Sequence, residues 1–146
     1  MLKNTKSKAP PMIFECKDFV VLCDGTLDHS EEAWSEKYSL MPQHVCQRLM
    51  QDNKPVFGIF VAPKIEPNLA QQLFKATWYA KGEFRELNIF PLSIEQIVAI
   101  VQSFKRKKFS VREFKEALGK FVELKNGVKN WKEWYDALSK ELSMIF

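Results

Sequence analysis

Residues 12–26 have the sequence MIFECKDFVVLCDGT, in which two short apolar runs flank the polar pair Lys17-Asp18. Short runs of apolar and β-branched residues on both sides of a two-residue polar break are typical of a β-hairpin. If Lys17-Asp18 form the centre of the turn, antiparallel pairing places Phe14 opposite Val21. The sequence therefore predicts a hairpin whose second strand ends in the carboxylate of Asp24.

The size and composition of the chain predict one globular α/β domain. The chain has 146 residues, of which 46% are hydrophobic and 27% charged, and no apolar run approaches the roughly 18 residues of a membrane span. Its three cysteines show no CxxC spacing, so we expect free thiols, a cytoplasmic location and no membrane partner. We divide the domain into a basic tail (1–10), an α/β core (11–104) and C-terminal helices (105–146).

Positive charge is concentrated in the C-terminal part of the chain. The net charge is +4, but between residues 105 and 132 ten Lys or Arg face three Glu. The run Lys105-Arg106-Lys107-Lys108 is a candidate contact for DNA phosphates. The alternative is a solvated linker between helices, because short basic runs are common.

The order of apolar patterns predicts a mixed β-sheet that starts with the hairpin, is flanked by helices and ends with a C-terminal helical pair. After the hairpin we expect a polar loop over 27–40 and a short helix from Pro42 to about Asp52. Beyond it we expect a buried strand (56–62), a helix from Pro67 to Gly82, a strand (87–90), and three helices that follow the capping residues Ser93, Ser110 and Asn130.

Several of these segments together resemble the cleavage domains of AlwI- and FokI-type restriction endonucleases. The segments that carry the resemblance are 18–27, 42–45, 56–63 and 89–96, and it extends from about residue 9 to residue 105. The resemblance implies a restriction endonuclease-like fold of the PD-(D/E)XK superfamily. It also implies hydrolysis of DNA phosphodiester bonds with Mg²⁺ or Mn²⁺ as cofactor, and DNA as a partner, together with a DNA-recognition subunit or a second copy of the chain.

The resemblance assigns the site residue by residue. The metal-binding and catalytic carboxylate of the family falls on Asp24, its hydroxyl residue on Thr26 and its helix histidine on His44. The first aspartate of the family falls on Pro11, which cannot bind a cation. A second ligand would then have to come from Glu31, Glu32 or Glu36, and a catalytically degenerate module that binds DNA or a partner protein is the alternative function.

Two further alternatives concern individual residues. Glu15-Cys16-Lys17 has the spacing of an ExK element, but the predicted register places Glu15 about 13 Å along the strands from Asp24 at about 3.3 Å per residue. Asp24-Gly25 are also ordinary residues for a strand end, and a lone histidine such as His44 is more often structural than catalytic.

Overall fold

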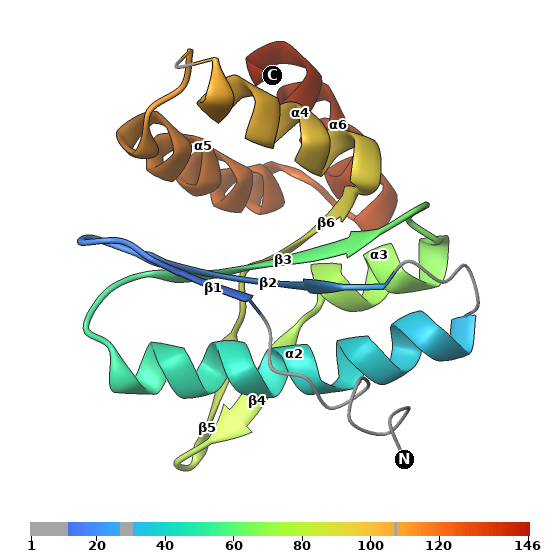
Figure 1. Ribbon diagram of the computed structural model, residues 1–146. Helices are drawn as coiled ribbons and strands as arrows, with labels where there is room; N and C mark the ends of the chain where they lie inside the picture. Colours follow the sequence, from blue (N-terminus) through green and yellow to red (C-terminus); the bar gives the residue numbers. More distant parts are fainter. Residues whose placement is uncertain (1–11, 27–30, 107) are drawn as a thin grey trace, which may run out of the picture.

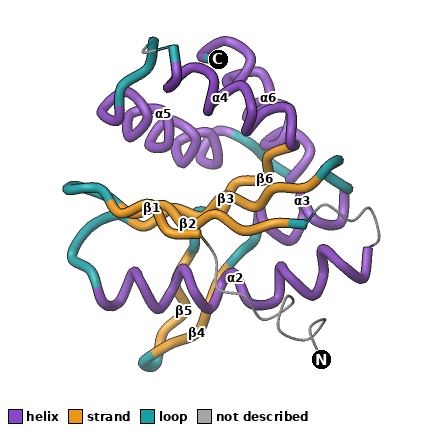
Figure 2. Tube along the Cα trace, viewed as in Figure 1, coloured by secondary structure: helices purple, strands orange, loops and turns teal. Residues whose placement is uncertain are grey.

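A four-stranded sheet organises the chain in the computed structural model, which describes residues 12–26, 31–106 and 108–146, with the backbone alone over 31–39. The strand order is β1-β2-β3-β6 (Figures 1 and 2). The strands are β1 (Met12–Glu15), β2 (Val20–Gly25), β3 (Val56–Ala62) and β6 (Ile89–Ser93). β1 pairs antiparallel with β2, whereas β2, β3 and β6 run parallel, so the predicted mixed sheet is confirmed.

The predicted register of the hairpin is confirmed. Phe14 lies opposite Val21 and Glu15 opposite Val20, and the amide of Cys16 donates to the carbonyl of Phe19 at 2.9 Å across the turn. Cys16 therefore does not face Cys23, and all three cysteines of the chain are free thiols, as expected.

Helices cover both faces of the sheet. α2 (Glu31–Gln51) lies on one face (Figure 1). The other face is covered by α4 (Ile94–Lys105), α5 (Val111–Leu124) and α6 (Trp131–Ile145). The loop predicted over 27–40 is wrong from Glu31 onward, and Pro42 lies inside the helix instead of opening it. Trp34, Tyr38, Met41 and Val45 have helical spacing, but the acidic residues before them favoured a loop, and Pro42 indicated a helix start. Residues 27–30 lie outside the described part of the chain.

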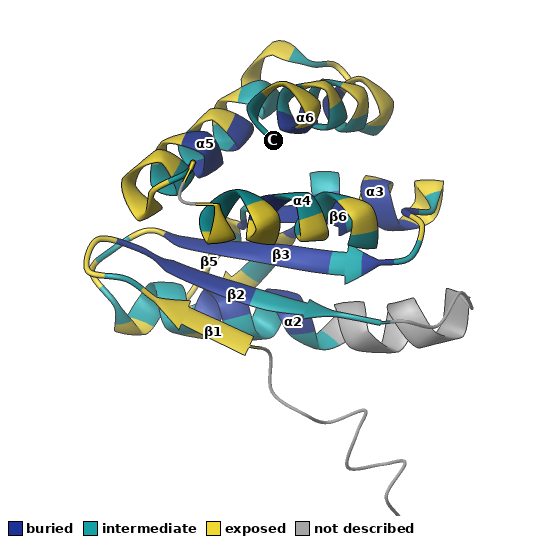
Figure 3. Cartoon of the chain, turned by 45° about the horizontal axis from the view of Figure 1, so that its top comes forward, coloured by how far each residue is buried: buried dark blue, intermediate teal, exposed yellow. Residues whose placement is uncertain are grey.

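β3 is the buried centre of the molecule, as its continuous apolar sequence predicts. Six of its seven residues are buried, and Figure 3 shows the strand in dark blue between the helical layers. Gly58 leaves room for α2, because a Cβ at this position would lie 3.0 Å from Met41 Cε and 3.2 Å from Val45 Cγ2. On the opposite face, Phe57 stacks on Phe90 of β6 with ring centroids 6.4 Å apart.

The connection between β3 and β6 differs from the prediction. α3 (Pro67–Phe74) ends early, and a second hairpin of β4 (Thr77–Ala80) and β5 (Glu83–Glu86) follows it, where a helix to Gly82 was expected. Lys81 and Gly82 have φ of 51° and 83°, which is the geometry of a type I′ hairpin turn. Gly82 thus makes a turn instead of ending a helix, and the strand predicted over 87–90 begins at Ile89.

The three C-terminal helices are confirmed, with their caps. α4 (Ile94–Lys105) and α5 (Val111–Leu124) begin with capping boxes formed by Ser93 and Ser110, and a short 3₁₀ turn, η1 (Lys125–Gly127), precedes α6 (Trp131–Ile145). α5 and α6 contact each other, and Trp134 of α6 is fully buried. None of the helices in the described ranges is long and apolar enough to cross a membrane.

Two glycine substitutions test this packing. Gly58→Ala should lower the free energy of unfolding by about 1–3 kcal/mol, because the added methyl group overpacks the space between β3 and α2. Gly119→Ala, in α5, should raise it by about 0.5–1 kcal/mol, because open space surrounds that position and alanine favours a helix. Urea unfolding of both variants measures the difference, and equal effects would contradict the packing.

Candidate functional site

Asp24 lies at the end of β2, on the face of the sheet that α2 covers. Side chains alternate between faces along a strand, so Asp24 and Leu22 share a face. Leu22 pairs with Gly58, whose open side faces Met41 and Val45 of α2. The carboxylate therefore lies on the α2 side of the sheet, where the strand ends.

The backbone around Asp24 is held by its neighbour β3. Gly25 still pairs with Val61, and the amide of Thr26 donates to the carbonyl of Val61 at 3.0 Å. The amide of Gly25 donates to Asp24 Oδ1 at 2.8 Å. A Cβ on Gly25 would overlap the carbonyl of Val61, so only glycine fits at this position. Asp24-Gly25 thus belong to the sheet ladder, and no free turn forms at the predicted metal position.

The charge of Asp24 acts on the thiol next to it. Burial, and secondly the negative charge of Asp24, raise the pKa of Cys23 to about 11. Cys23 is therefore a neutral thiol at physiological pH, and its pKa depends in part on the charge state of the carboxylate.

The other acidic residues considered in the sequence analysis, Glu31, Glu32 and Glu36, belong to the first turns of α2. The chain leaves β2 at Thr26 and enters α2 at Glu31, so the start of α2 and the end of β2 lie at the same end of the sheet (Figure 1). Within residues 12–26, 31–106 and 108–146, no group of three or more His, Cys, Asp or Glu side chains is placed to hold a metal ion. The side chains of Glu31, Glu32 and Glu36, and the whole of Pro11, are not described, so their predicted roles stay predictions.

His44 lies on α2 between the two residues that pack against Gly58. The residue is half-buried, and its Nδ1 is buried with no hydrogen-bond partner in the described part of the chain. His44 therefore lies beneath the middle of β3. Asp24 is paired with Phe60, which is closer to the end of that strand. The catalytic role assigned to His44 stays a prediction.

The basic run lies at the other end of the sheet. Lys105, Arg106 and Lys108 are exposed at the end of α4 and just beyond it, and Lys107 is not described. Phe114, near the start of the following helix α5, packs on Phe19 at the start of β2 with ring centroids 6.3 Å apart. Asp24 is five residues further along, about 17 Å at about 3.3 Å per residue. The structure therefore does not bring the basic run and Asp24 together.

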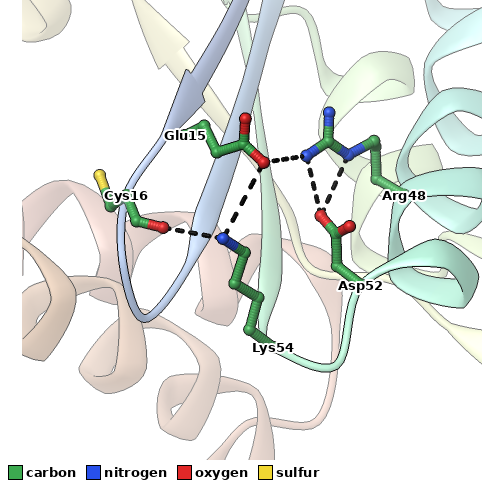
Figure 4. Close-up of polar contacts among 5 residues, drawn as sticks. All are labelled: Glu15, Cys16, Arg48, Asp52 and Lys54. Atoms are coloured by element: carbon green, nitrogen blue, oxygen red, sulfur yellow. Dashed lines mark hydrogen bonds and ion pairs between the residues drawn. The ribbon is translucent and has the colours of Figure 1, made fainter.

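Glu15 takes part in a polar network that the sequence analysis missed. Arg48 Nη2 of α2 lies 2.9 Å from Glu15 Oε1 and 2.8 Å from Asp52 Oδ2, and Lys54 Nζ donates to the carbonyl of Cys16 at 2.9 Å (Figure 4). Glu15 is thus part of an ion-pair network that joins β1 to α2, four pairing positions from Asp24, which argues against the ExK alternative. The i,i+4 spacing of Arg48 and Asp52 was visible in the sequence, but the contact to β1 needs the fold.

These features define the class of the protein: an α/β domain in which a hairpin opens a mixed sheet and places a carboxylate at the end of its second strand. Among solved structures, the chain is similar to the small subunit of the heterodimeric restriction endonuclease R.BspD6I, with a TM-score of 0.61 and 18% sequence identity over 91% of this chain and 64% of that chain. The fold is therefore that of a restriction endonuclease subunit, and the chain spans less than two thirds of the length of this relative.

The family follows from the sequence match. The model of the AlwI restriction endonuclease family matches residues 4–100, more than half of the chain, and the chain belongs to this family. The match covers the hairpin, α2, β3 and β6, which are the segments that carry the resemblance found in the sequence. No match was found among curated proteins.

The close approach of Gly25 to β3 can be tested directly. Gly25→Ala should destabilise the fold by about 3 kcal/mol or more, because the methyl group collides with a backbone carbonyl that cannot move as a side chain does. Gly127→Ala, which adds a methyl group in open space, is the matched control and should change stability little. Thermal unfolding of the two variants distinguishes them, and an unaffected Gly25→Ala protein would contradict the geometry at Asp24.

Proposed function

We propose that this chain is a Mg²⁺-dependent DNA endonuclease domain or subunit that hydrolyses phosphodiester bonds at Asp24. The observation that supports it most is the position of Asp24 at the end of β2, in a chain that belongs to the AlwI restriction endonuclease family. The fold of a restriction endonuclease subunit supports the same role.

The ligands that the chain can offer at Asp24 suit Mg²⁺ better than a cation that must be coordinated by protein groups alone. Mg²⁺ keeps several waters and is commonly held by one or two carboxylates plus a substrate phosphate. Asp24 supplies one carboxylate, and we propose that Glu31, Glu32 or Glu36 at the start of α2 supplies the second. Such a site would be completed by DNA, so we expect the ion to bind more tightly in the presence of a duplex than to the free protein.

Asp24 and Thr26 would have different roles at the scissile phosphate. When bound, the cation would polarise the phosphate and lower the pKa of the attacking water. Asp24 would hold the cation, and the hydroxyl of Thr26, two residues further along, would position the water by a hydrogen bond. The ladder between β2 and β3 keeps both residues in place, because Thr26 and Gly25 are fixed to the carbonyl and backbone of Val61.

Substitution of Asp24 separates catalysis from folding. Asp24→Asn should abolish Mg²⁺-dependent cleavage while leaving the fold intact, because the amide keeps the shape of the side chain and loses the charge. The same variant should lower the pKa of Cys23 from about 11, because one of the two causes of its elevation is removed. Plasmid cleavage measures the first effect, and the rate of alkylation of Cys23 against pH, followed by mass spectrometry, measures the second.

The thiol also reports metal binding without any need for activity. In the wild-type protein, Mg²⁺ added with duplex DNA should neutralise Asp24 and therefore raise the alkylation rate of Cys23 near pH 9. The rate in Asp24→Asn should not respond to Mg²⁺, and Cys16, at the other end of the hairpin, is the internal control. A cleaving Asp24→Asn enzyme, or a wild-type Cys23 that ignores Mg²⁺, would refute the proposed site.

We propose that the exposed cations at the end of α4 contact phosphates of the DNA at a distance from the cleavage site. Replacing Lys105, Arg106 and Lys108 by glutamine should reduce the slope of log affinity against log salt by up to about 2.7, or about 0.9 for each phosphate that is no longer neutralised. Glutamine at the exposed residues Lys75, Lys81 and Lys140 removes the same charge elsewhere and is the control. Fluorescence anisotropy in EDTA measures both slopes; equal slopes would assign the basic run to an ordinary solvated linker.

A further inference from the structure

Lys125 lines a cavity that the candidate nuclease site does not use. The cavity has a volume of about 360 Å³ and lies between the end of α3, the β4–β5 hairpin, the residue before β6 and the η1 turn. Phe74, Thr77 and Asn88 are among the other residues that line it. Asp24 ends a strand that is two places away from β6 in the sheet, so the cavity is separate from the candidate site.

The side-chain nitrogen of Lys125 is held against an aromatic ring. Lys125 is half-buried, and its Nζ lies 4.9 Å from the centroid of the Trp134 ring. Trp134 is fully buried, and its ring contacts that of Phe74 with centroids 5.4 Å apart. Within the described part of the chain, no carboxylate forms an ion pair with Lys125. The amine is therefore positioned by the ring and carries no anionic partner.

The surroundings of Lys125 also make its amine more reactive. Burial lowers the pKa of Lys125, and the negative charge of Glu86 opposes part of this change. Only the neutral form of an amine has the free electron pair that attacks a carbonyl carbon, so a lower pKa increases the reactive fraction at neutral pH. A half-buried lysine in a cavity is thus better suited to covalent chemistry than a lysine on the open surface.

We propose that Lys125, in the cavity beside Trp134, is a site of acylation by small activated acyl donors, namely acyl phosphates and acyl thioesters. This inference is independent of the proposed nuclease activity. The electron pair of the neutral Nζ attacks the carbonyl carbon and forms the amide C–N bond. The bond from that carbon to the phosphate oxygen or to the sulfur breaks, phosphate or thiolate leaves with the electron pair, and one proton of the amine passes to water.

The cavity suits a neutral acyl group better than a bound anion. Glu86 lines the cavity, and α3 ends there at Phe74 with the carbonyl end of the helix, which carries partial negative charge. An anion would meet both, whereas an acyl group is uncharged. Phe74 offers the acyl group an apolar contact, and the side-chain amides of Asn88 and Asn126, which also line the cavity, are donors for its carbonyl oxygen. Because Glu86 and Asn126 are exposed, the charged leaving group can return to solvent.

Acylation kinetics resolved by residue test the proposal on the full chain. The protein is treated with acetyl phosphate, or in a second series with a small acetyl thioester, and peptide mass spectrometry gives the initial rate at each lysine. Lys125 should react at least about threefold faster than the exposed Lys132 and Lys140, because the neutral fraction of an amine rises as its pKa falls. In urea this advantage should disappear, because it comes from the fold and not from the local sequence.

Three variants test the role of the cavity. Lys125→Arg keeps the positive charge and should remove the fast phase of acetylation from the mass of the intact protein. Glu86→Gln should raise the rate at Lys125 about twofold, because loss of the nearby negative charge lowers the pKa of the amine further. Glu116→Gln removes the same charge from α5, more than two helical turns before Lys125, and is the matched control that should leave the rate unchanged. Circular dichroism checks that the variants remain folded.

Each outcome decides the proposal. A fast phase that maps to Lys125, disappears in urea and accelerates in Glu86→Gln alone supports it, and the donor that produces this phase identifies the source of the acyl group. A Lys125 that reacts no faster than Lys132 and Lys140 with either donor overturns the proposal. An advantage that persists in urea, or equal rates in Glu86→Gln and Glu116→Gln, overturns the assignment of the reactivity to the cavity.

Discussion

The parallel ladder between β2 and β3 is the constraint on which the rest of the molecule depends. β3 is buried on both faces, and the absence of side chains at Gly58 and Gly25 lets α2 and the end of β2 approach it closely. The hairpin, the β6 strand and both helical layers are all attached to these two strands. Burial of the apolar residues of β3 favours folding. The hydrogen-bond ladder between β2 and β3 fixes the positions of the two strands.

The position of Asp24 is a product of the same ladder. The carboxylate sits on a strand end that is hydrogen-bonded to Val61, and the α2 helix is packed beneath it on the same face. A site built on regular elements keeps its geometry better than one built on a free loop. The polar network of Glu15, Arg48 and Asp52 holds the opposite end of the hairpin against α2, so both ends of the hairpin are tied to neighbouring elements.

The parts of the fold that follow from local chemistry could be predicted from the sequence. The register at Phe14 and Val21 follows from a two-residue turn, β3 from its apolar run, and the C-terminal helices from the caps Ser93, Ser110 and Asn130. The first half of α2 has helical spacing at Trp34 and Tyr38, but its acidic composition and Pro42, which indicated a helix start, concealed it. Leu69, Leu73, Ala76 and Ala80 have helical spacing by coincidence: the first two are buried on α3, but Ala80 belongs to β4, where aromatic and β-branched neighbours favour a strand.

Part of the candidate site could also be predicted from the sequence, and part could not. The strand end at Asp24 could be predicted from the hairpin register, and its chemical role only from the resemblance to a family. The separation of Asp24 from the basic run, and the contact of Arg48 with β1, depend on how α2 and α5 pack on the sheet. Those are contacts between residues distant in sequence, and no local pattern encodes them.

The close contact of Gly25 with Val61 has a consequence for comparing related sequences. The glycine is required by the backbone of the neighbouring strand, whether or not the domain cuts DNA. A relative that had lost activity would still be selected to keep this glycine, while its aspartate would be free to drift. In an Asp-Gly pair of this kind, the presence of the glycine indicates common ancestry and a shared fold. Only the residue before it indicates whether the catalytic chemistry is retained.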